Sequence, residues 1–187
     1  MKKIICIIDC GTSGLEKIIW NVTESGNIYK VLKLDEIEGA NFNLFAGIII
    51  TGAPILLTEV NQDEFVKRFD FLRSINIPVL GICLGHQIMG LVYDAEINIT
   101  DRIEKKEKIE ILVQDKLFAY VENFSEFQEL HSEYISLPRD FDLLATSASC
   151  VNEAMKHKTK MLYSTQFHPE LSGDPGKTLL RNFIEMC

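Results

Sequence analysis

The sequence predicts an α/β fold in which a doubly wound, mostly parallel sheet carries helices on both faces and a small antiparallel segment follows. Three observations predict this class. Short apolar, β-branched runs alternate with stretches of helical spacing through the first part of the chain. These runs end in polar or glycine-bearing loops, where parallel sheets place their ligand sites. After residue 94 the pattern changes to shorter β-like runs that are joined by turns.

The first part of the chain contains four expected strands and the helices between them. Residues 3–8 form a continuous β-branched run, which is typical of a buried parallel strand. A helix is expected over residues 15–22, and the apolar spacing of residues 59–74, with charges between, predicts another. The other three strands are expected at residues 29–34, 45–51 and 77–82.

The second part of the chain predicts short strands and a closing helix. The charged stretch 101–110 alternates in sign, which indicates a solvated face. Residues 153–155 and 161–167 predict a hairpin that turns at residues 157–160, and a helix is expected over residues 176–186. The remaining short strands are expected at residues 97–100, 109–113, 127–130 and 143–147.

Composition limits the classes of function. The chain has 187 residues, is 47% hydrophobic and 25% charged, and is most simply a single domain over residues 1–187. Its formal net charge of −8 argues against a nucleic-acid or acidic-membrane binder. No apolar run approaches the ~20 residues that cross a bilayer. The five cysteines are irregularly spaced, which favours reduced thiols in a cytoplasmic protein and suggests no zinc site.

The most informative stretch is Gly81-Ile82-Cys83-Leu84-Gly85, where an apolar strand meets the start of a helix. Gly-x-Cys-x-Gly is the sulfur counterpart of the nucleophile elbow, which presents its side chain at a helix N-terminus. Such a position favours an anion and lowers the pKa of a thiol. The N–H of Leu84 is then expected to donate to an oxyanion. A cysteine in apolar surroundings is more often a buried packing residue, but the paired glycines and the polar His86-Gln87 favour a nucleophile.

A nucleophilic cysteine needs an imidazole base whose tautomer is fixed by a third group. In extended backbone, residues i and i+2 face the same side, so a His-x-Glu pair can supply both groups. Two stretches fit, His131-Ser132-Glu133 and His168-Pro169-Glu170. Spacing leaves both open, while Pro169 favours the second because it pushes the preceding residue toward extended geometry. His157 lies in a basic turn and is expected at the surface.

The elbow and a later motif together resemble a known family. Residues 81–87 followed by Gln166-Phe167-His168-Pro169-Glu170 are similar to the class I (triad) glutamine amidotransferases, over essentially the whole chain. This resemblance implies a flavodoxin-like fold, with Cys83 as nucleophile, His168 as general base and acid, and Glu170 as the group that orients His168. The resemblance further implies that Gly52, Ala53 and Leu84 supply oxyanion N–H groups and that Gln87 helps to hold the substrate glutamine. His131 is a further candidate on the substrate side.

Within this family, residues 141–147, 153–160 and 182–183 are similar to the separate glutaminase subunit of two-subunit GMP synthases. That resemblance implies hydrolysis of L-glutamine and transfer of the ammonia to an ATP-pyrophosphatase partner that converts XMP to GMP. ATP and Mg²⁺ would belong to the partner, and no cofactor is expected in this chain. Three alternatives remain: the glutaminase component of an anthranilate- or aminodeoxychorismate-type synthase, a stand-alone γ-glutamyl hydrolase, and a non-catalytic regulatory module.

The sequence departs from the family pattern at several positions. Gly52-Ala53-Pro54 stands where the family usually has Gly-Gly-Pro. Because alanine disfavours positive φ, this predicts an oxyanion hole that is imperfect or forms on partner binding. Asp94-Ala95 replaces a Gly-Gly pair, and Leu130-His131-Ser132-Glu133 only loosely matches a Ser-His-x-Asp pattern.

Overall fold

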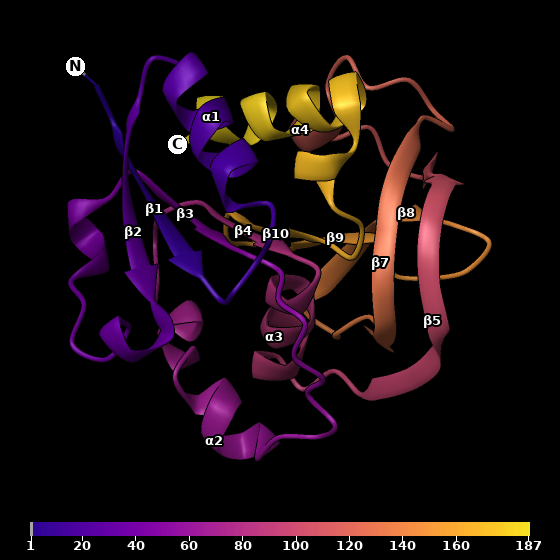
Figure 1. Ribbon diagram of the computed structural model, residues 1–187, viewed down its shortest axis with the longest axis horizontal. Helices are drawn as coiled ribbons and strands as arrows, with labels where there is room; N and C mark the ends of the chain where they lie inside the picture. Colours follow the sequence, from indigo (N-terminus) through magenta and orange to yellow (C-terminus); the bar gives the residue numbers. More distant parts are fainter. Residues whose placement is uncertain (1) are drawn as a thin grey trace.

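The computed structural model describes residues 2–187 and is built around an eight-stranded mixed sheet in the order β2-β1-β3-β4-β10-β9-β8-β6 (Figure 1). The first five strands of this order run parallel to one another, so the predicted doubly wound, mostly parallel sheet is confirmed. These five strands are β1 (Ile4–Asp9), β2 (Ile28–Lys33), β3 (Gly47–Ile50), β4 (Val79–Ile82) and β10 (Leu162–Thr165).

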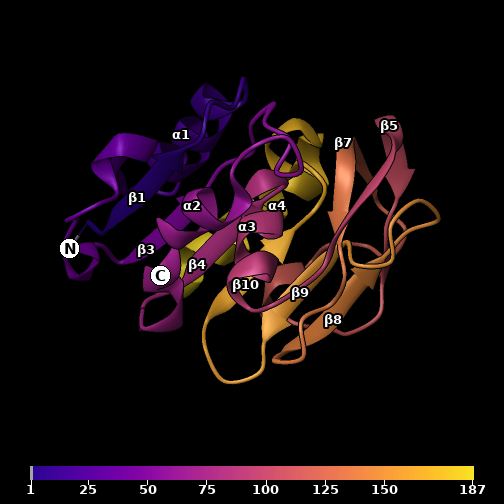
Figure 2. The same ribbon diagram turned by 90° about the horizontal axis from the view of Figure 1, so that it is seen from below.

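The other end of the sheet is antiparallel and includes the predicted hairpin. Strand β9 (Ala154–His157) pairs with β10 in antiparallel register, with Lys156 opposite Tyr163. Strands β8 (Phe141–Thr146) and β6 (Glu110–Ile111) extend this end. Two long strands, β5 (Ile97–Lys108) and β7 (Glu126–Ile135), form a separate antiparallel sheet beside it (Figure 2).

Helices cover both faces of the main sheet. Helices α1 (Leu15–Glu24) and α4 (Gly173–Met186) lie on one face, and α2 (Gln62–Lys67) and α3 (Leu84–Val92) lie on the other (Figure 1). Successive residues of β1 therefore enter two different cores: Ile5 and Ile7 pack on the α1 side, and Cys6 and Ile8 on the α3 side. Burial on both faces explains why these strands read as continuous apolar runs.

The helix predicted over residues 59–74 is wrong in length. Helix α2 begins after Asn61, whose side chain accepts a hydrogen bond from the Glu64 N–H, and it ends at Lys67. A 3₁₀ turn at Asp70–Arg73 follows. Phe69, which precedes this tighter turn, and Leu72 within it are both fully buried.

Strands β5 and β7 are longer than predicted. Residues 101–108 belong to β5, so this charged stretch is a solvated face on a paired strand. Strand β7 continues to Ile135, and every second side chain from residue 127 to residue 135 is buried. Glu129, His131 and Glu133 are among these inward-facing side chains, and their polarity hid the two-residue period that an apolar strand would have shown.

The expectation that His157 lies at the surface is also wrong. His157 belongs to β9, is only 7% exposed, and its ring packs edge-on against Tyr93 and Phe141 at centroid distances of 5.1 Å each. Its Nδ1 accepts hydrogen bonds from the N–H groups of Thr159 and Lys160. The basic turn therefore folds around the ring, and burial lowers the pKa of His157.

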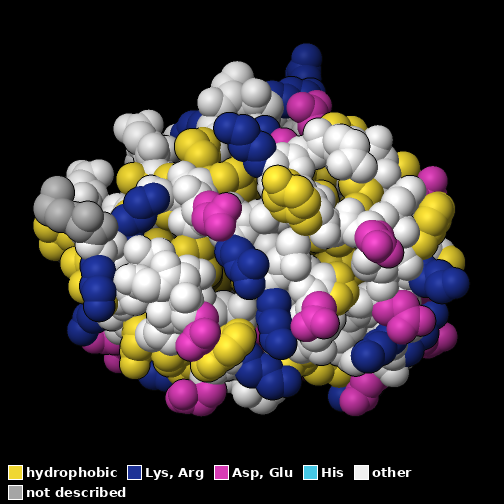
Figure 3. Space-filling model, turned by 90° about the horizontal axis from the view of Figure 1, so that it is seen from above, with side chains coloured by type: hydrophobic (Ala, Val, Ile, Leu, Met, Phe, Trp, Pro, Cys, Tyr) yellow, Lys and Arg dark blue, Asp and Glu magenta, His cyan; other side chains and the backbone are white. Residues whose placement is uncertain are grey.

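The outer face over α1 and α4 carries mixed charge. Figure 3 shows Lys and Arg side chains interspersed with Asp and Glu, and small hydrophobic areas between them. In the part of this face that the structure describes, a short row of adjacent Lys and Arg side chains runs down the middle, with Asp and Glu side chains on both sides of it. None of the helices in the same residues is both long enough and apolar enough to cross a membrane.

Candidate active site

Cys83 occupies a strained turn between β4 and α3. Its φ of 50° and ψ of −101° are unusual for a residue other than glycine, and its N–H donates to the Thr165 carbonyl at 2.8 Å. The flanking glycines allow close packing around this turn. A Cβ on Gly81 would lie 2.5 Å from the Gly85 carbonyl oxygen, and a Cβ on Gly85 would lie 2.4 Å from that of Ile50. The elbow therefore presents one thiol at the start of α3, as the sequence predicts.

His168 and Glu170 form the second part of the site. His168 follows β10, and its Nδ1 lies 2.8 Å from Glu170 Oε1. The Glu170 side chain is fully buried beneath the loop after β1, where a Cβ on Gly14 would lie 2.7 Å from Glu170 Cγ. The His168 N–H donates to the Gln128 carbonyl at 2.9 Å, which ties this segment to β7. These contacts fix the imidazole orientation.

The structure brings His168 and Cys83 together. A Cβ on Gly52 would lie 2.9 Å from His168 Cε1 and 3.3 Å from Cys83 Cβ, so both side chains converge on this glycine. Within residues 2–187, His168 Nε2 is buried and has no aligned hydrogen-bond partner. Burial lowers the pKa of His168, but the nearby Cys83 sulfur and Glu170 carboxylate outweigh it and hold that pKa well above its usual range. The ring is therefore placed to accept the thiol proton.

Two further groups contact the sulfur. Cys83 Sγ lies 3.6 Å from the Leu130 carbonyl oxygen, and the Gln166 side-chain amide donates to it at 3.7 Å. Gln166 also accepts a hydrogen bond from Gln87 Nε2 at 3.3 Å. Sequence reasoning gave Gln166 no role. It follows β10 directly and opens the motif that contains His168 and Glu170, and this position was the signal that could have indicated one.

The expected oxyanion region lies beside the sulfur. Gly52 and Ala53 follow β3, and Leu84 is the first residue of α3, where an N–H has no partner within the helix. Neither Gly52 nor Ala53 has a positive φ in this structure, and the predicted imperfection of the oxyanion hole stays a prediction. Alanine therefore costs no backbone strain here. Asp94, in contrast, does take the left-handed conformation, with φ of 65°.

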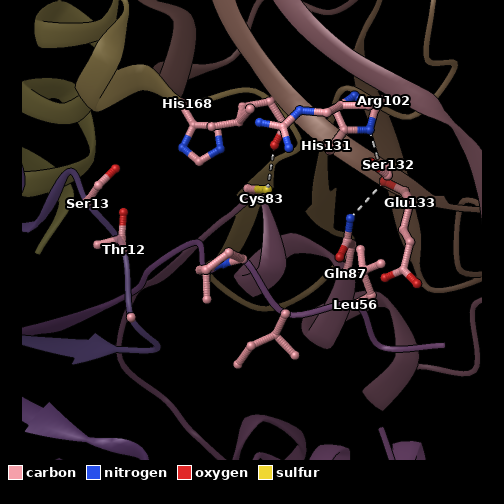
Figure 4. A pocket seen from close by; sticks show the side chains of 15 residues that line it. Thr12, Ser13, Leu56, Cys83, Gln87, Arg102, His131, Ser132, Glu133 and His168 are labelled. Carbon is pink, nitrogen blue, oxygen red and sulfur yellow. Dashed lines mark hydrogen bonds between the residues drawn. The ribbon is translucent and has the colours of Figure 1, made fainter. Parts of the chain in front are cut away.

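Ala53, Cys83, Gln87 and His168 line one pocket at the carboxyl ends of the parallel strands (Figure 4). The lining does not include Gly52, Leu84 or Glu170. Its volume is about 360 Å³, which suits a ligand the size of one amino acid. Loops after β1 and β3 form one wall, and residues of β5 and β7 form the opposite wall. The residues that line it are Gly11, Thr12, Ser13, Ala53, Pro54, Ile55, Leu56, Cys83, Gln87, Arg102, Leu130, His131, Ser132, Glu133 and His168.

The second His-x-Glu stretch does not form a catalytic pair. Glu133 points away from His131 and accepts hydrogen bonds from the Leu57 and Thr58 N–H groups at 2.8 and 3.0 Å. Glu133 thereby holds in place the loop after β3, whose residues 53–56 line the pocket. His131 Nδ1 instead bonds the Glu133 carbonyl at 3.0 Å, and its Nε2 lies 3.4 Å from Glu129 Oε2. The carboxylate beside His131 thus precedes it by two residues.

Behind His131 lies a pair of carboxyl groups that sequence reasoning missed. Glu129 and Glu153 are both fully buried, and Glu153 accepts a hydrogen bond from the Ser147 hydroxyl at 2.6 Å. Burial raises the pKa of Glu129 to about 7 and raises that of Glu153 well above its ordinary value. Their charges interact, because the neighbouring Glu129 carboxylate adds to burial in raising the pKa of Glu153. In residues 2–187, no group of three or more metal-ligating side chains is arranged to hold a metal ion.

Because of this buried pair, we expect the free energy of unfolding to depend on pH. The folded protein binds the Glu129 proton more tightly than the unfolded chain, whose carboxyl has a pKa near 4.5. Stability should therefore fall as pH rises from about 4.5 to about 7, by up to about 1.4 kcal/mol per pH unit. Glu129→Gln should match the wild type near pH 5 and exceed it by about 1–3 kcal/mol near pH 8 in denaturant unfolding.

Glu126→Gln is the matched control, because Glu126 lies on the same strand and is exposed. Its stability should follow the wild-type pH dependence. Parallel curves for Glu129→Gln and the wild type across pH 5–8 would contradict a raised pKa at Glu129.

The sequence is similar to a known family and to named proteins. The family described as glutamine amidotransferase class-I matches residues 6–187. The chain is 39% identical over 160 residues to a Methanobrevibacter smithii protein named as the A subunit of glutamine-hydrolyzing GMP synthase, and the match covers 83% of this chain and 79% of the relative. A Pyrococcus abyssi protein of the same name is 33% identical over 192 residues, and the match covers 98% of each chain.

Solved structures resemble the fold closely. A Thermoplasma acidophilum protein, described as a putative A subunit of GMP synthase, superposes with a TM-score of 0.91 at 27% identity, covering 100% of this chain and 94% of that one. A glutamine amidotransferase from Thermotoga maritima has a TM-score of 0.82 at 20% identity, covering 99% and 97%. The latter likeness concerns the fold alone, and both agree with the predicted sheet architecture.

Proposed function

Because the chain belongs to the class-I glutamine amidotransferase family, we propose that it is the glutaminase subunit of a two-subunit GMP synthase. It hydrolyses L-glutamine to glutamate and ammonia, and the ammonia passes to a separate synthase subunit that converts XMP to GMP with ATP and Mg²⁺. The observation that carries this proposal is a row of three buried side chains beside the pocket, in which His168 lies between Cys83 and Glu170. The names of the relatives support the choice of acceptor.

The first chemical step uses the elbow and the imidazole. His168 Nε2 accepts the Cys83 thiol proton, and the thiolate attacks the side-chain amide carbon of glutamine. Glu170 Oε1 accepts the Nδ1–H of His168 and stabilises the imidazolium that forms. The oxyanion then lies near the N–H of Leu84 and the backbone after β3 at Gly52 and Ala53. Each such donor typically contributes ~10²–10³ in rate.

The second step releases ammonia and restores the enzyme. His168 gives its proton to the departing nitrogen, and the carbon–nitrogen bond breaks. Ammonia leaves, and the γ-glutamyl group remains on Cys83 as a thioester. Water then attacks the thioester carbon and gives a proton to His168; the carbon–sulfur bond breaks, glutamate leaves, and His168 returns the proton to the Cys83 sulfur. Gln87 lines the pocket and is held by the Glu133 carbonyl at 2.8 Å through Nε2. Its side-chain oxygen is proposed to accept a hydrogen bond from the substrate.

The test is an ammonia-release assay with L-glutamine, alone and with the GMP synthase ATPase subunit of the same organism, XMP and ATP. We expect GMP to form from glutamine only when both subunits are present, and glutamine hydrolysis to rise about tenfold or more on adding the synthase mixture. Ammonium chloride should replace this chain in GMP formation, which controls for the activity of the synthase subunit. High solitary turnover on γ-glutamyl peptides, unchanged by the synthase, would instead identify a stand-alone hydrolase.

A further inference from the structure

The pocket wall formed by β5 contains a charged group that has no assigned role. We propose that Arg102 binds the α-carboxylate of the glutamine substrate and so selects a free amino acid over a γ-amide that lacks this charge. This inference rests on the proposed glutaminase function and adds the subsite for the end of the substrate remote from Cys83. It is carried by three features: the local strand irregularity, the charge of the pocket lining and the pocket's size.

The strand irregularity turns Arg102 toward the pocket. In the antiparallel pairing of β5 with β7, Ile99 lies opposite Glu133 and Ile103 lies opposite His131. Residues 100–102 of β5 therefore face the single residue Ser132 of β7. Such a bulge bends the strand and changes the direction of its side chains, which is common beside active sites. Arg102 is thereby placed next to two pocket residues of β7.

The charge of the lining favours an anion at this position. Arg102 is the only lysine or arginine that lines the pocket within residues 2–187. The carboxylate of Glu133, which also lines it, is held by the Leu57 and Thr58 N–H groups. In Figure 4 the Arg102 side chain extends from β5 over the pocket, toward the part that holds Cys83 and His168. A carboxylate bound there meets a permanent positive charge.

The ion pair of Arg102 leaves some of its N–H donors available for a ligand. Arg102 forms an ion pair with Glu104, with distances of 2.9 Å from Nη2 and 3.1 Å from Nε to Oε2. Both side chains are more than half exposed, and an ion pair at such a surface contributes little to stability. A guanidinium carries five N–H donors in a planar fork that matches a carboxylate, so Arg102 can bind substrate while retaining Glu104 or releasing it.

The pocket's dimensions agree with this assignment. Only a few bonds separate the side-chain amide of glutamine from its α-carboxylate, and the pocket of about 360 Å³ holds Cys83 and Arg102 in one lining. A substrate whose amide lies at Cys83 therefore places its carboxylate within the same small volume. Loss of a charge-assisted hydrogen bond is expected to weaken binding about 10–100-fold, which corresponds to about 1.4–2.8 kcal/mol.

Steady-state kinetics with two substrates test the proposal. L-glutamine is compared with its α-amide, in which a neutral carboxamide replaces the carboxylate. Arg102→Gln should raise the KM for L-glutamine about 10–100-fold and change kcat by less than about threefold. Its preference for L-glutamine over the α-amide should fall by the same factor, and Arg102→Lys should restore part of it. Lys106→Gln is the matched control, because Lys106 is exposed on the same strand outside the pocket.

A binding measurement separates this inference from the function on which it rests. Calorimetry gives the Kd of L-glutamine for Cys83→Ala, which holds substrate without turnover, and for Cys83→Ala/Arg102→Gln. Weaker binding by about tenfold or more in the double variant supports the carboxylate subsite. Equal Kd values, or equal losses for L-glutamine and the α-amide, overturn it and leave the glutaminase function standing. If the wild type does not hydrolyse L-glutamine and Cys83→Ala does not bind it, the proposed function itself is overturned.

Discussion

Cys83→Ala should abolish glutamine hydrolysis, with a loss of at least about 10⁴-fold. The elbow presents the thiol at the pocket end of α3, beside the ring of His168. Alanine removes the atom that attacks the amide and leaves the backbone donors in place. The variant should still fold, because the change removes one atom from a residue that is 5% exposed. Ammonia release measures the loss, and calorimetric glutamine binding checks that the pocket survives.

Covalent labelling gives an independent readout. A glutamine-like diazoketone should label the wild type at a single cysteine and fail to label Cys83→Ala. Cys187→Ala is the matched control, because burial raises the pKa of Cys187 to about 12 and keeps that thiol unreactive. It should retain both hydrolysis and labelling. Labelling or ammonia release that persists in Cys83→Ala would rule out this nucleophile.

The sequence predicted the parallel sheet and the elbow because each depends on local pattern. Strands such as β1 and β3 are buried on both faces, so they appear as continuous apolar runs whatever their partners. The turn at Cys83 is also a local feature, marked by the close-packed Gly81 and Gly85. The pocket at the carboxyl ends of the strands then follows from the rule for ligand sites in open parallel sheets.

The parts that the sequence could not predict depend on contacts between distant segments. Glu129 and Glu153 lie on different strands, and each is fully buried against the usual preference of carboxylates. The bulge that directs Arg102 inward is a matter of pairing register, which the composition of the charged stretch does not encode. The conformation at Ala53 is likewise decided by how the loop after β3 packs, so a family pattern with glycine could not reveal it.

His168→Ala should lower kcat/KM by about 10³–10⁴-fold or more, and Glu170→Gln should cost considerably less, about 10–10²-fold. Without the imidazole the thiol has no base and the departing nitrogen has no acid. A glutamine at position 170 can still accept the Nδ1–H of His168, as the Glu170 oxygen does now at 2.8 Å. The amide keeps the orientation of the ring and loses only the negative charge beside it. Ammonia release over a range of glutamine concentrations measures both losses.

The lost charge should also appear in the pH profile. Burial lowers the pKa of His168, and Cys83 and Glu170 together outweigh this effect and raise it. The pairing of imidazolium with thiolate is lost when pH rises through that raised pKa, which sets the alkaline limb of kcat/KM. Glu170→Gln removes one of the two negative neighbours, so the limb should move to lower pH. Glu185→Gln, which removes an exposed carboxylate on α4, should leave it in place. If His168→Ala and Glu170→Gln lose activity equally, or the alkaline limb does not move, then another group orients the imidazole and stabilises its charge.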